Sequence, residues 1–466
     1  MQERDIELGD LLPRMVVPPP GPKSHEMARQ LSEVEMPNGS PIKWGITPIF
    51  WSQAKGSNVV DPDGNIYIDL TGGSSVATAG HCNDDIVAAI QRQAEILLHT
   101  QGITNPSPCR IELCRKLREI TPGDLSMSHL ASGGAEAVEV AYKTARLYTK
   151  KHGVIAFQQG FHGKTGTPLT LTSRSYYRDG FLPLTPGVVH LPYAYCYRCP
   201  FERRYPECDC FCARFVEYNL DMHESGLPEI AAIVMEAALG HGGWVFPPPE
   251  FLQRIRRMSA ERGILLIMDE IITGFGRTGK MFACEHSEVV PDIMVLGKAM
   301  ASGLPISAVV TTEEIGSCWQ PAQHSSTFLG HPLGVAACMA SLNYIITHGL
   351  VQRSAELGAY AKSVLAEMQQ RHPLIGDVRG LGLMFGVEIV KDRTTKVPGV
   401  DEAMEVVTRL YRKGIMASNL GGTHKNVLKL SPPLVITREQ LDYALKAIDD
   451  ALGEVEYEKG YRSHLA

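Results

Sequence analysis

The sequence predicts an α/β fold in which a mostly parallel central sheet is covered by helices on both faces. Short apolar runs alternate with longer segments of helical periodicity, which is typical of parallel strands joined by helical crossovers. The apolar runs lie at 153–157, 231–236, 263–270, 292–298 and 306–311. With 466 residues and 44% hydrophobic composition, the chain can bury a large core, and about 100–200 residues per domain indicates two or three domains.

Residues 1–75 are expected to form an N-terminal arm and a small β-unit. PPPGP at 18–22 predicts an extended arm, followed by a short helix over 23–34. From Trp51 onward, SNVVDPDGNIYIDL alternates apolar and polar residues around a D-P-D-G turn. This pattern predicts an antiparallel hairpin.

Residues 76–338 are expected to form the large domain, and residues 339–466 a C-terminal small domain. The N-terminal β-unit and the C-terminal segment together would build a smaller α/β lobe. In the C-terminal part, the apolar segments GLGLMFGVEIV and NVLKLSPPLVIT alternate with helical patterns, and a terminal helix follows. The other expected helices lie at 85–98, 108–120, 351–371 and 402–413.

The composition argues against several classes of partner. The net charge is −6 and the charged residues alternate in sign, so no nucleic acid partner is expected. Apolar runs all stay below the ~18–20 residues that span a bilayer. The N-terminus, MQERDIELGD, is acidic, unlike a signal peptide. We therefore expect no membrane partner and a cytoplasmic location.

Five of the eleven cysteines lie in a predicted insertion at 193–213. Cys196, Cys199, Cys208, Cys210 and Cys212 follow the spacing C-x2-C-x8-C-x-C-x-C, which could ligate zinc or an iron–sulfur cluster. C-x-C-x-C is not a usual zinc spacing, so packed or occasionally oxidised surface thiols are the preferred interpretation. Metal binding by this insertion stays open, and no metal is expected at the active site.

Polar residues at the ends of two apolar runs are the first candidates for chemistry, because ligands of open α/β sheets bind at the carboxyl ends of strands. ILLIMDE ends on Asp269 and Glu270, and IMVLGK ends on Lys298. A desolvated lysine can form a Schiff base, and a nearby carboxylate can keep a pyridine nitrogen protonated. Each residue alone could be a solvated strand end, but together they indicate pyridoxal 5′-phosphate.

A phosphate site is indicated by HLASGGAEAVEV, where Ser132, Gly133, Gly134 and Ala135 begin a strongly helical segment. Backbone N–H groups at a helix N-terminus bind anions. Many helices begin in this way without binding a ligand, so this segment counts only beside the other candidates.

Five segments, in the same order and over nearly the whole chain, resemble the class III (ω-type) aminotransferases. They are SGGAEAVEVAYKTAR, QQGFHGKT, IMDEIITGFGRTGKMFA, GKAMASGLP and HSSTFLGHPLG. The resemblance implies the PLP-dependent transferase fold type I, pyridoxal 5′-phosphate as the cofactor, and an obligate homodimer with a shared active site.

The resemblance also implies roles for individual residues. Lys298 would hold the cofactor as a Schiff base and move the substrate proton, and Asp269 would pair with the ring nitrogen. Phe161 and Ile271 would pack on the two faces of the ring. The remaining implied cofactor contacts are Gly133, Gly134, Ala135, His162, Glu236 and the partner subunit's Thr327.

Three positions depart from the family pattern. Ile272 stands where many members have a glutamine that bonds the phenolic oxygen of the cofactor. Ala237 replaces a proline after Glu236, and Gly133 replaces the first serine of the phosphate segment. None of these changes is expected to prevent cofactor binding.

Lys429 is the candidate substrate-binding residue. In family members that hold a substrate carboxylate, an arginine occupies its position in NVLKLSPPLVIT. Arginine grips a carboxylate with two parallel hydrogen bonds, whereas lysine offers a point charge on a flexible stem. We therefore expect a substrate whose anionic group is differently placed or shaped, such as a phosphonate or a distal carboxylate. The alternative is that Lys429 is a solvated strand residue and another arginine binds the substrate.

The expected reaction is transamination between an amine or amino acid and a keto acid or aldehyde. The same fold and residues also serve amino acid racemases and epimerases, and lyases that remove ammonia or phosphate from a β-substituted amine. A non-catalytic scaffold is the remote alternative, since Lys298, Asp269, Phe161 and Thr327 are all present.

Overall fold

The computed structural model describes residues 8–39 and 41–462. Its largest element is a seven-stranded sheet with the strand order β4-β10-β9-β8-β7-β5-β6. Only β10 runs antiparallel to its neighbours, so the predicted mostly parallel sheet is confirmed. The strands are β4 (Met127–Ala131), β5 (Gly153–Phe157), β6 (Val188–Leu191), β7 (Ile230–Glu236), β8 (Leu265–Asp269), β9 (Ile293–Leu296) and β10 (Ser307–Thr311).

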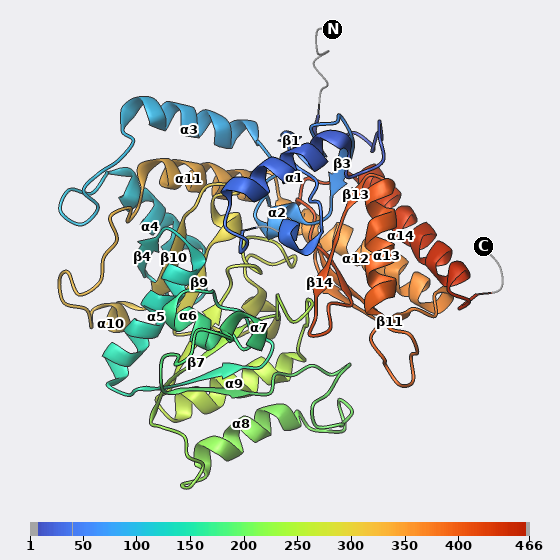
Figure 1. Ribbon diagram of the computed structural model, residues 1–466. Coiled ribbons are helices and arrows are strands. Elements are labelled where there is room, and N and C mark those ends of the chain that lie inside the picture. The colour runs from blue at the N-terminus through green and yellow to red at the C-terminus, as the bar shows by residue number, and fades with distance from the viewer. Residues whose placement is uncertain (1–7, 40, 463–466) are drawn as a thin grey trace.

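Helices bury both faces of this sheet (Figure 1). Side chains alternate along each strand, so Val154 and Val234 pack on one face under α5 (Gly134–Thr149), whereas Ile155 and Met235 pack on the other. The second face is covered by α4 (Cys109–Ile120), α9 (Pro249–Glu261) and α11 (Pro332–Thr347). Burial on both faces explains why the inner strands are continuous apolar runs.

The sheet also differs from the prediction in two ways. Strands β4 and β6, at the two edges, were not predicted, because MSHLA and VVHL carry polar or partly exposed residues and make no continuous buried run. The expected strand over 292–298 ends at Leu296, and Lys298 begins the short 3-10 helix η3 (Lys298–Met300) instead.

The expected boundary between residues 338 and 339 lies inside α11. A division at Gly349, between α11 and α12 (Leu350–Arg371), does not cut a helix, and we propose this position instead.

Two four-stranded sheets build the smaller lobe. One has the order β1-β2-β3-β13, in which the N-terminal hairpin pairs with a C-terminal strand, and the other is antiparallel with the order β11-β12-β15-β14. Both ends of the chain therefore contribute to this lobe. The strands are β1 (Gln53–Lys55), β2 (Asn58–Val60), β3 (Ile66–Asp69), β11 (Ile375–Leu381), β12 (Met384–Ile389), β13 (Ile415–Met416), β14 (Ser418–Gly421) and β15 (Val427–Leu430).

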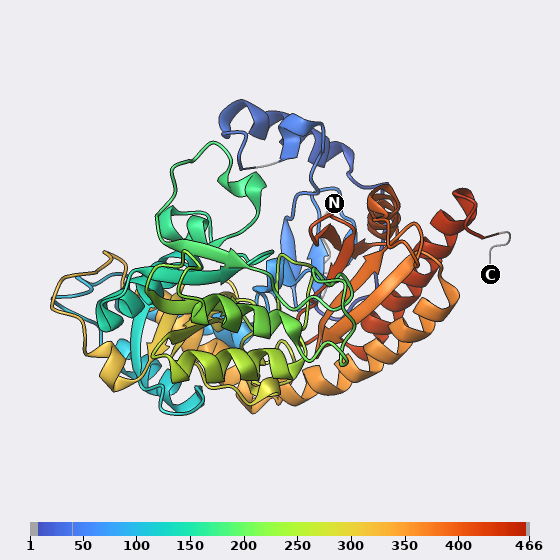
Figure 2. The same ribbon diagram turned by 90° about the horizontal axis from the view of Figure 1, so that it is seen from below.

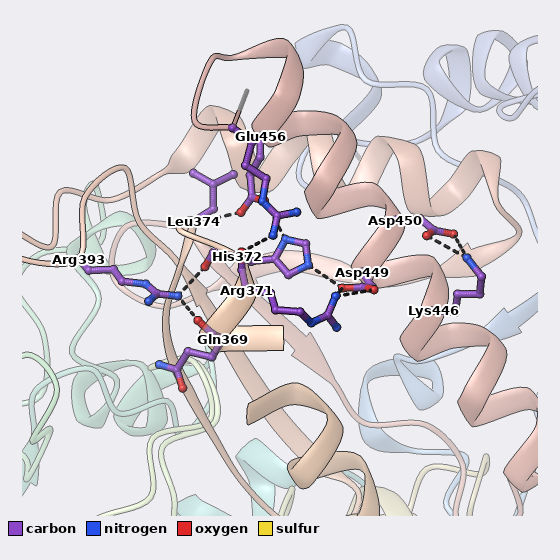
Figure 3. Close-up of polar contacts among 10 residues, drawn as sticks. Gln369, Arg371, His372, Leu374, Arg393, Lys446, Asp449, Asp450 and Glu456 are labelled. Carbon is purple, nitrogen blue, oxygen red and sulfur yellow. Dashed lines mark hydrogen bonds and ion pairs between the residues drawn. The ribbon is translucent and has the colours of Figure 1, made fainter. Parts of the chain in front are cut away.

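A buried histidine ties α12 to α14 (Arg438–Glu458) in this lobe (Figure 3). His372, directly after α12, lies 2.8 Å from Glu456 through Nδ1 and 2.6 Å from Asp449 through Nε2. Arg393 donates a hydrogen bond to the His372 carbonyl at 2.6 Å. Each polar group of this buried junction therefore has a partner, as stability requires.

The N-terminal helix α1 (Pro22–Val34) and the segment around α7 (Ser175–Arg178) lie on the same side of the molecule (Figure 2). The remaining helices are η1 (Pro41–Trp44), α2 (Gly72–Ser75), α3 (Asp84–Ile96), α6 (Gly166–Leu171), α8 (Phe211–Asp221), η2 (Ala283–Ser287), α10 (Glu313–Gly316) and α13 (Val400–Arg412). Within the described residues, no single helix is long and apolar enough to cross a membrane. Among the helices of residues 8–39 and 41–462, only α11 and α12 taken together are long and apolar enough, and this pair is bent by 60° at its break.

Candidate active site

A cavity of about 520 Å³ lies where the large domain meets the smaller lobe. Lys298 lines it from the end of the large sheet, Lys429 from β15, and Thr71 and Ser74 from the N-terminal segment. We call this space the catalytic cavity. The structure thus brings together residues more than 350 positions apart in the chain (Ser74 and Lys429).

Lys298 is strained and partly buried. Its φ of +44° lies in the left-handed region, where a residue with a side chain stays only if its surroundings hold it. Burial lowers the pKa of its amine to about 8, although the charges of Asp269 and Glu236 act in the opposite direction. About a tenth of this amine is therefore neutral, and hence nucleophilic, at pH 7.

Asp269, at the end of β8, is held by two hydrogen bonds. His162 Nδ1 donates to Oδ2 at 2.8 Å, and the backbone N–H of Ile271 donates to Oδ1 at 3.1 Å. Burial lowers the pKa of His162, but the hydrogen bond and charge of Asp269 outweigh it, and the net shift is upward. His162 thus fixes the orientation of the carboxylate and adds positive charge beside it.

Glu236, at the end of β7, links the F-H-G segment (Phe161, His162 and Gly163) to the loop that follows β7. Its Oε1 accepts the backbone N–H of Phe161 at 3.0 Å, and its Oε2 accepts the N–H of Gly240 at 2.7 Å. Burial raises its pKa to about 7. Glu236 therefore positions the Phe161 backbone.

The N-terminus of α5 forms an open cradle for an anion. Gly133 is the N-cap, no side chain caps the helix, and a Cβ on Gly133 would meet no atom within 4 Å. Its carbonyl is held by Ser307 Oγ at 2.9 Å. By contrast, a Cβ on Gly134 would lie 2.8 Å from Ile271, and one on Gly163 would lie 2.7 Å from the Cβ of Ala135. The N-terminus of α5 is thus closely packed against Ile271, which follows Asp269, and against Gly163 of the F-H-G segment.

These residues fit pyridoxal 5′-phosphate, the cofactor that the resemblance implies. Free N–H groups at the start of a 16-residue helix suit the phosphate. A buried, oriented carboxylate at Asp269 suits a protonated ring nitrogen. The neutral amine of Lys298 suits covalent attachment.

Of the predicted site residues, Lys298 and Lys429 line the catalytic cavity itself. Phe161, His162, Glu236, Asp269 and Ile271 do not line it but are linked to one another by the contacts described above. Thr327 has no such link within the described part of the chain. It is exposed in the turn that precedes α11. A contact with the cofactor would therefore have to come from a second subunit, and the homodimer stays a prediction.

Several cavity residues were not predicted from the sequence. His241 stacks on Phe161 at 4.0 Å between ring centroids, and Lys429 Nζ lies 4.7 Å from the centroid of the Trp244 ring. Lys164 and Arg174 also line the cavity. The positions of His241 in G-H-G-G, beside Glu236, and of Lys164, directly after F-H-G, were available signals. No local pattern marks Arg174.

The cavity is strongly cationic. It is lined by Lys164, Arg174, Lys298, Lys425 and Lys429, and no carboxylate side chain lies among the described lining residues. Burial, followed by the charge of Lys298, lowers the pKa of Lys429 to about 8. An anionic ligand would relieve this accumulation of like charge.

The insertion cysteines carry no disulfide. The thiols of Cys196, Cys199, Cys208 and Cys210 are near enough to interact, since the last three contribute to the raised pKa of Cys196, after burial as its main cause. Nowhere in residues 8–39 and 41–462 does a group of three or more His, Cys, Asp or Glu side chains stand ready to hold a metal ion.

Comparisons with known proteins identify the family and the relatives of this chain. The family model "Aminotransferase class-III" matches residues 42–452. The isoleucine 2-epimerase of Lentilactobacillus buchneri is 40% identical over 412 residues, which are 86% of this chain and 89% of the relative. A probable 4-aminobutyrate aminotransferase of Bacillus subtilis (strain 168) is 36% identical over 403 residues, with coverages of 86% and 92%. The structure of an (S)-enantioselective omega-transaminase from Thermomicrobium roseum matches with a TM-score of 0.85 and 29% identity, over 93% of this chain and 98% of that one.

Proposed function

The chain belongs to the class-III aminotransferase family of PLP-dependent enzymes, and from this premise we propose that it transfers an amino group. The donor would be an amine or amino acid, and the acceptor a keto acid or aldehyde. The observation that carries the proposal is the amine of Lys298, which ends in the catalytic cavity with a pKa lowered to about 8 by burial.

Each part of the site has a task in this reaction. Bound pyridoxal 5′-phosphate supplies a pyridine ring that withdraws electrons from the substrate carbon. Lys298 would hold the cofactor and would take the proton from the substrate Cα. Its lowered pKa would let the amine both accept and release a proton near neutral pH. Asp269, oriented by His162, keeps the ring nitrogen protonated, and the start of α5 binds the phosphate.

The cationic cavity supports substrates with an anionic group besides the reacting centre. Lys429 would bind one such group, and Arg174 and Lys164 line the same cavity. A distal carboxylate or a phosphonate suits lysine as a point charge. This charge distribution indicates a substrate with an anionic group, and it suits transamination and epimerisation alike, because the amino acid substrates of both reactions carry a carboxylate.

Epimerisation is the second candidate, because the isoleucine 2-epimerase is 40% identical to this chain. One experiment separates the two reactions. The cofactor-loaded enzyme is mixed in D₂O with a panel of amines and amino acids, and the cofactor spectrum, keto products and deuterium at Cα are followed. Transamination gives the amino form of the cofactor with a keto product in equal amount. Deuterium at Cα with inverted configuration and no keto product would assign epimerisation instead, and ammonia release would assign a lyase.

We also propose a homodimer in the cytosol as the working form of the enzyme. The support is the resemblance at HSSTFLGHPLG and the exposure of Thr327, which does not line the catalytic cavity of its own chain. Two copies would complete each other's phosphate sites.

A further inference from the structure

A second cavity, of about 640 Å³, lies beside the catalytic cavity. The two cavities share a wall that includes Arg174, Tyr177 and His241. Lys298 and Lys429 line only the first. Phe161, which the resemblance places on the cofactor ring, lines the second cavity, so this cavity adjoins the cofactor site. None of the residues that fit the cofactor phosphate or ring nitrogen lines it.

Three cations converge on this second cavity. Arg174, Arg178 and Lys425 line it, and among the lining residues within the described part of the chain there is no carboxylate side chain. Within those same described residues, none of the three cations forms an ion pair. Arg174 donates to the carbonyl of Gly422 at 2.6 Å, which fixes its guanidinium between the two cavities. Lys425 Nζ lies 5.8 Å from the ring centroid of Tyr176.

The wall of the second cavity also leaves polar groups without partners. Gln159 adopts a φ of +66°, in the left-handed region, which costs free energy unless the surroundings require it. Its side-chain carbonyl oxygen is buried without a hydrogen-bond partner, as is His241 Nδ1. Leaving buried polar atoms unpaired is unfavourable, so the fold bears a free-energy cost at this wall.

We propose that the second cavity binds a small organic anion, with a carboxylate or phosphate group held by Arg174, Arg178 and Lys425. The rings of Tyr176 and Tyr177 would pack against its apolar or flat part. Guanidinium groups bind carboxylate and phosphate through paired, charge-assisted hydrogen bonds. Two sources share this chemistry, namely a separate effector and the distal end of a long substrate. Because Arg174, Tyr177 and His241 belong to both walls, an anion bound here alters the catalytic cavity directly.

Calorimetric titration of the cofactor-loaded enzyme with malonate, and separately with inorganic phosphate, tests this site. Arg178→Gln removes a cation that lines only the second cavity, and Lys429→Met removes one that lines only the catalytic cavity. The matched control is Lys446→Gln on α14. Lys446 forms an exposed ion pair with Asp450 (Figure 3). Cofactor absorbance and the melting temperature check that each variant is folded and loaded.

We expect Arg178→Gln to weaken binding of at least one probe about tenfold or more, the usual loss for a charge-assisted hydrogen bond. Lys429→Met and Lys446→Gln should change it less than about twofold. The proposal is overturned if the wild-type enzyme shows no saturable binding in the millimolar range, if Arg178→Gln binds like wild type, or if Lys429→Met abolishes binding. When binding is found, the probe is titrated again in the presence of the amine substrate. Competition between the two assigns the second cavity to the distal end of a substrate, and lack of competition assigns it to a separate effector. Since the readout is binding, failure of the proposed reaction leaves this test unaffected.

Discussion

The lowered pKa of Lys298 leads to a quantitative prediction about cofactor attachment. A lysine with the ordinary pKa of 10.5 is neutral in about 0.03% of molecules at pH 7, whereas a pKa of about 8 makes about 10% neutral. The neutral fraction, and with it the rate of attachment, is therefore raised about 300-fold at pH 7. The rate should climb between pH 6 and pH 8 and level off above about pH 9.

The measurement mixes apoenzyme with pyridoxal 5′-phosphate in a stopped-flow instrument and follows cofactor absorbance at each pH. N-acetyl-lysine in free solution is the control, and its rate should keep rising to about pH 10. Glu236→Gln provides a second check, because the charge of Glu236 raises the pKa of Lys298. Its removal should move the midpoint to lower pH. A rate that rises steadily through pH 10 in the wild-type enzyme would refute a desolvated Lys298.

Four further predictions address individual residues. Lys298→Ala should reduce turnover at least about 100-fold, the lower value for a positioned acid–base group, while the purified protein still binds the cofactor noncovalently; retained turnover would exclude the proposed proton carrier. Asp269→Asn should lower kcat about 100-fold or more with an unchanged melting temperature, and wild-type kinetics would show that the ring nitrogen is held elsewhere. Lys429→Met should raise KM for the best anionic substrate about tenfold, in line with the loss of one charged hydrogen bond, with little change for a neutral amine; equal KM values for both substrates would remove its recognition role. Light scattering should give a dimer. Thr327→Ala should weaken the affinity for the cofactor while the protein stays dimeric, whereas an active monomer would contradict a shared site.

The sequence indicates the central strands because they are buried on both faces. GVIAF and the run around Met268 are continuously apolar, so their assignment does not depend on distant contacts. The edge strands β4 and β6 have one neighbour each, and their partly exposed residues give no such run. Their existence follows only from the completed sheet.

Some residues of the candidate site can likewise be predicted from local sequence pattern, and others cannot. Lys298 and Asp269 are conspicuous because each interrupts or ends an apolar run, and the F-H-G and G-F-G-R-T-G segments have a family resemblance. Arg174 and Lys425 lie in loops of different domains and meet only because the chain folds the two domains together. Local pattern cannot signal such a meeting, since neither residue has a regular spacing relative to the other.

The central claim is that this chain holds pyridoxal 5′-phosphate through Lys298. The direct measurement is to reduce the cofactor-loaded enzyme with borohydride, digest it, and locate the added mass by tandem mass spectrometry. The account predicts that the reduced cofactor is attached to the amine of Lys298 in the peptide containing GKAMASGLP, and that Lys298→Ala carries no stable label. Labelling of another lysine, or no covalent label in a protein that absorbs like a loaded enzyme, would contradict it.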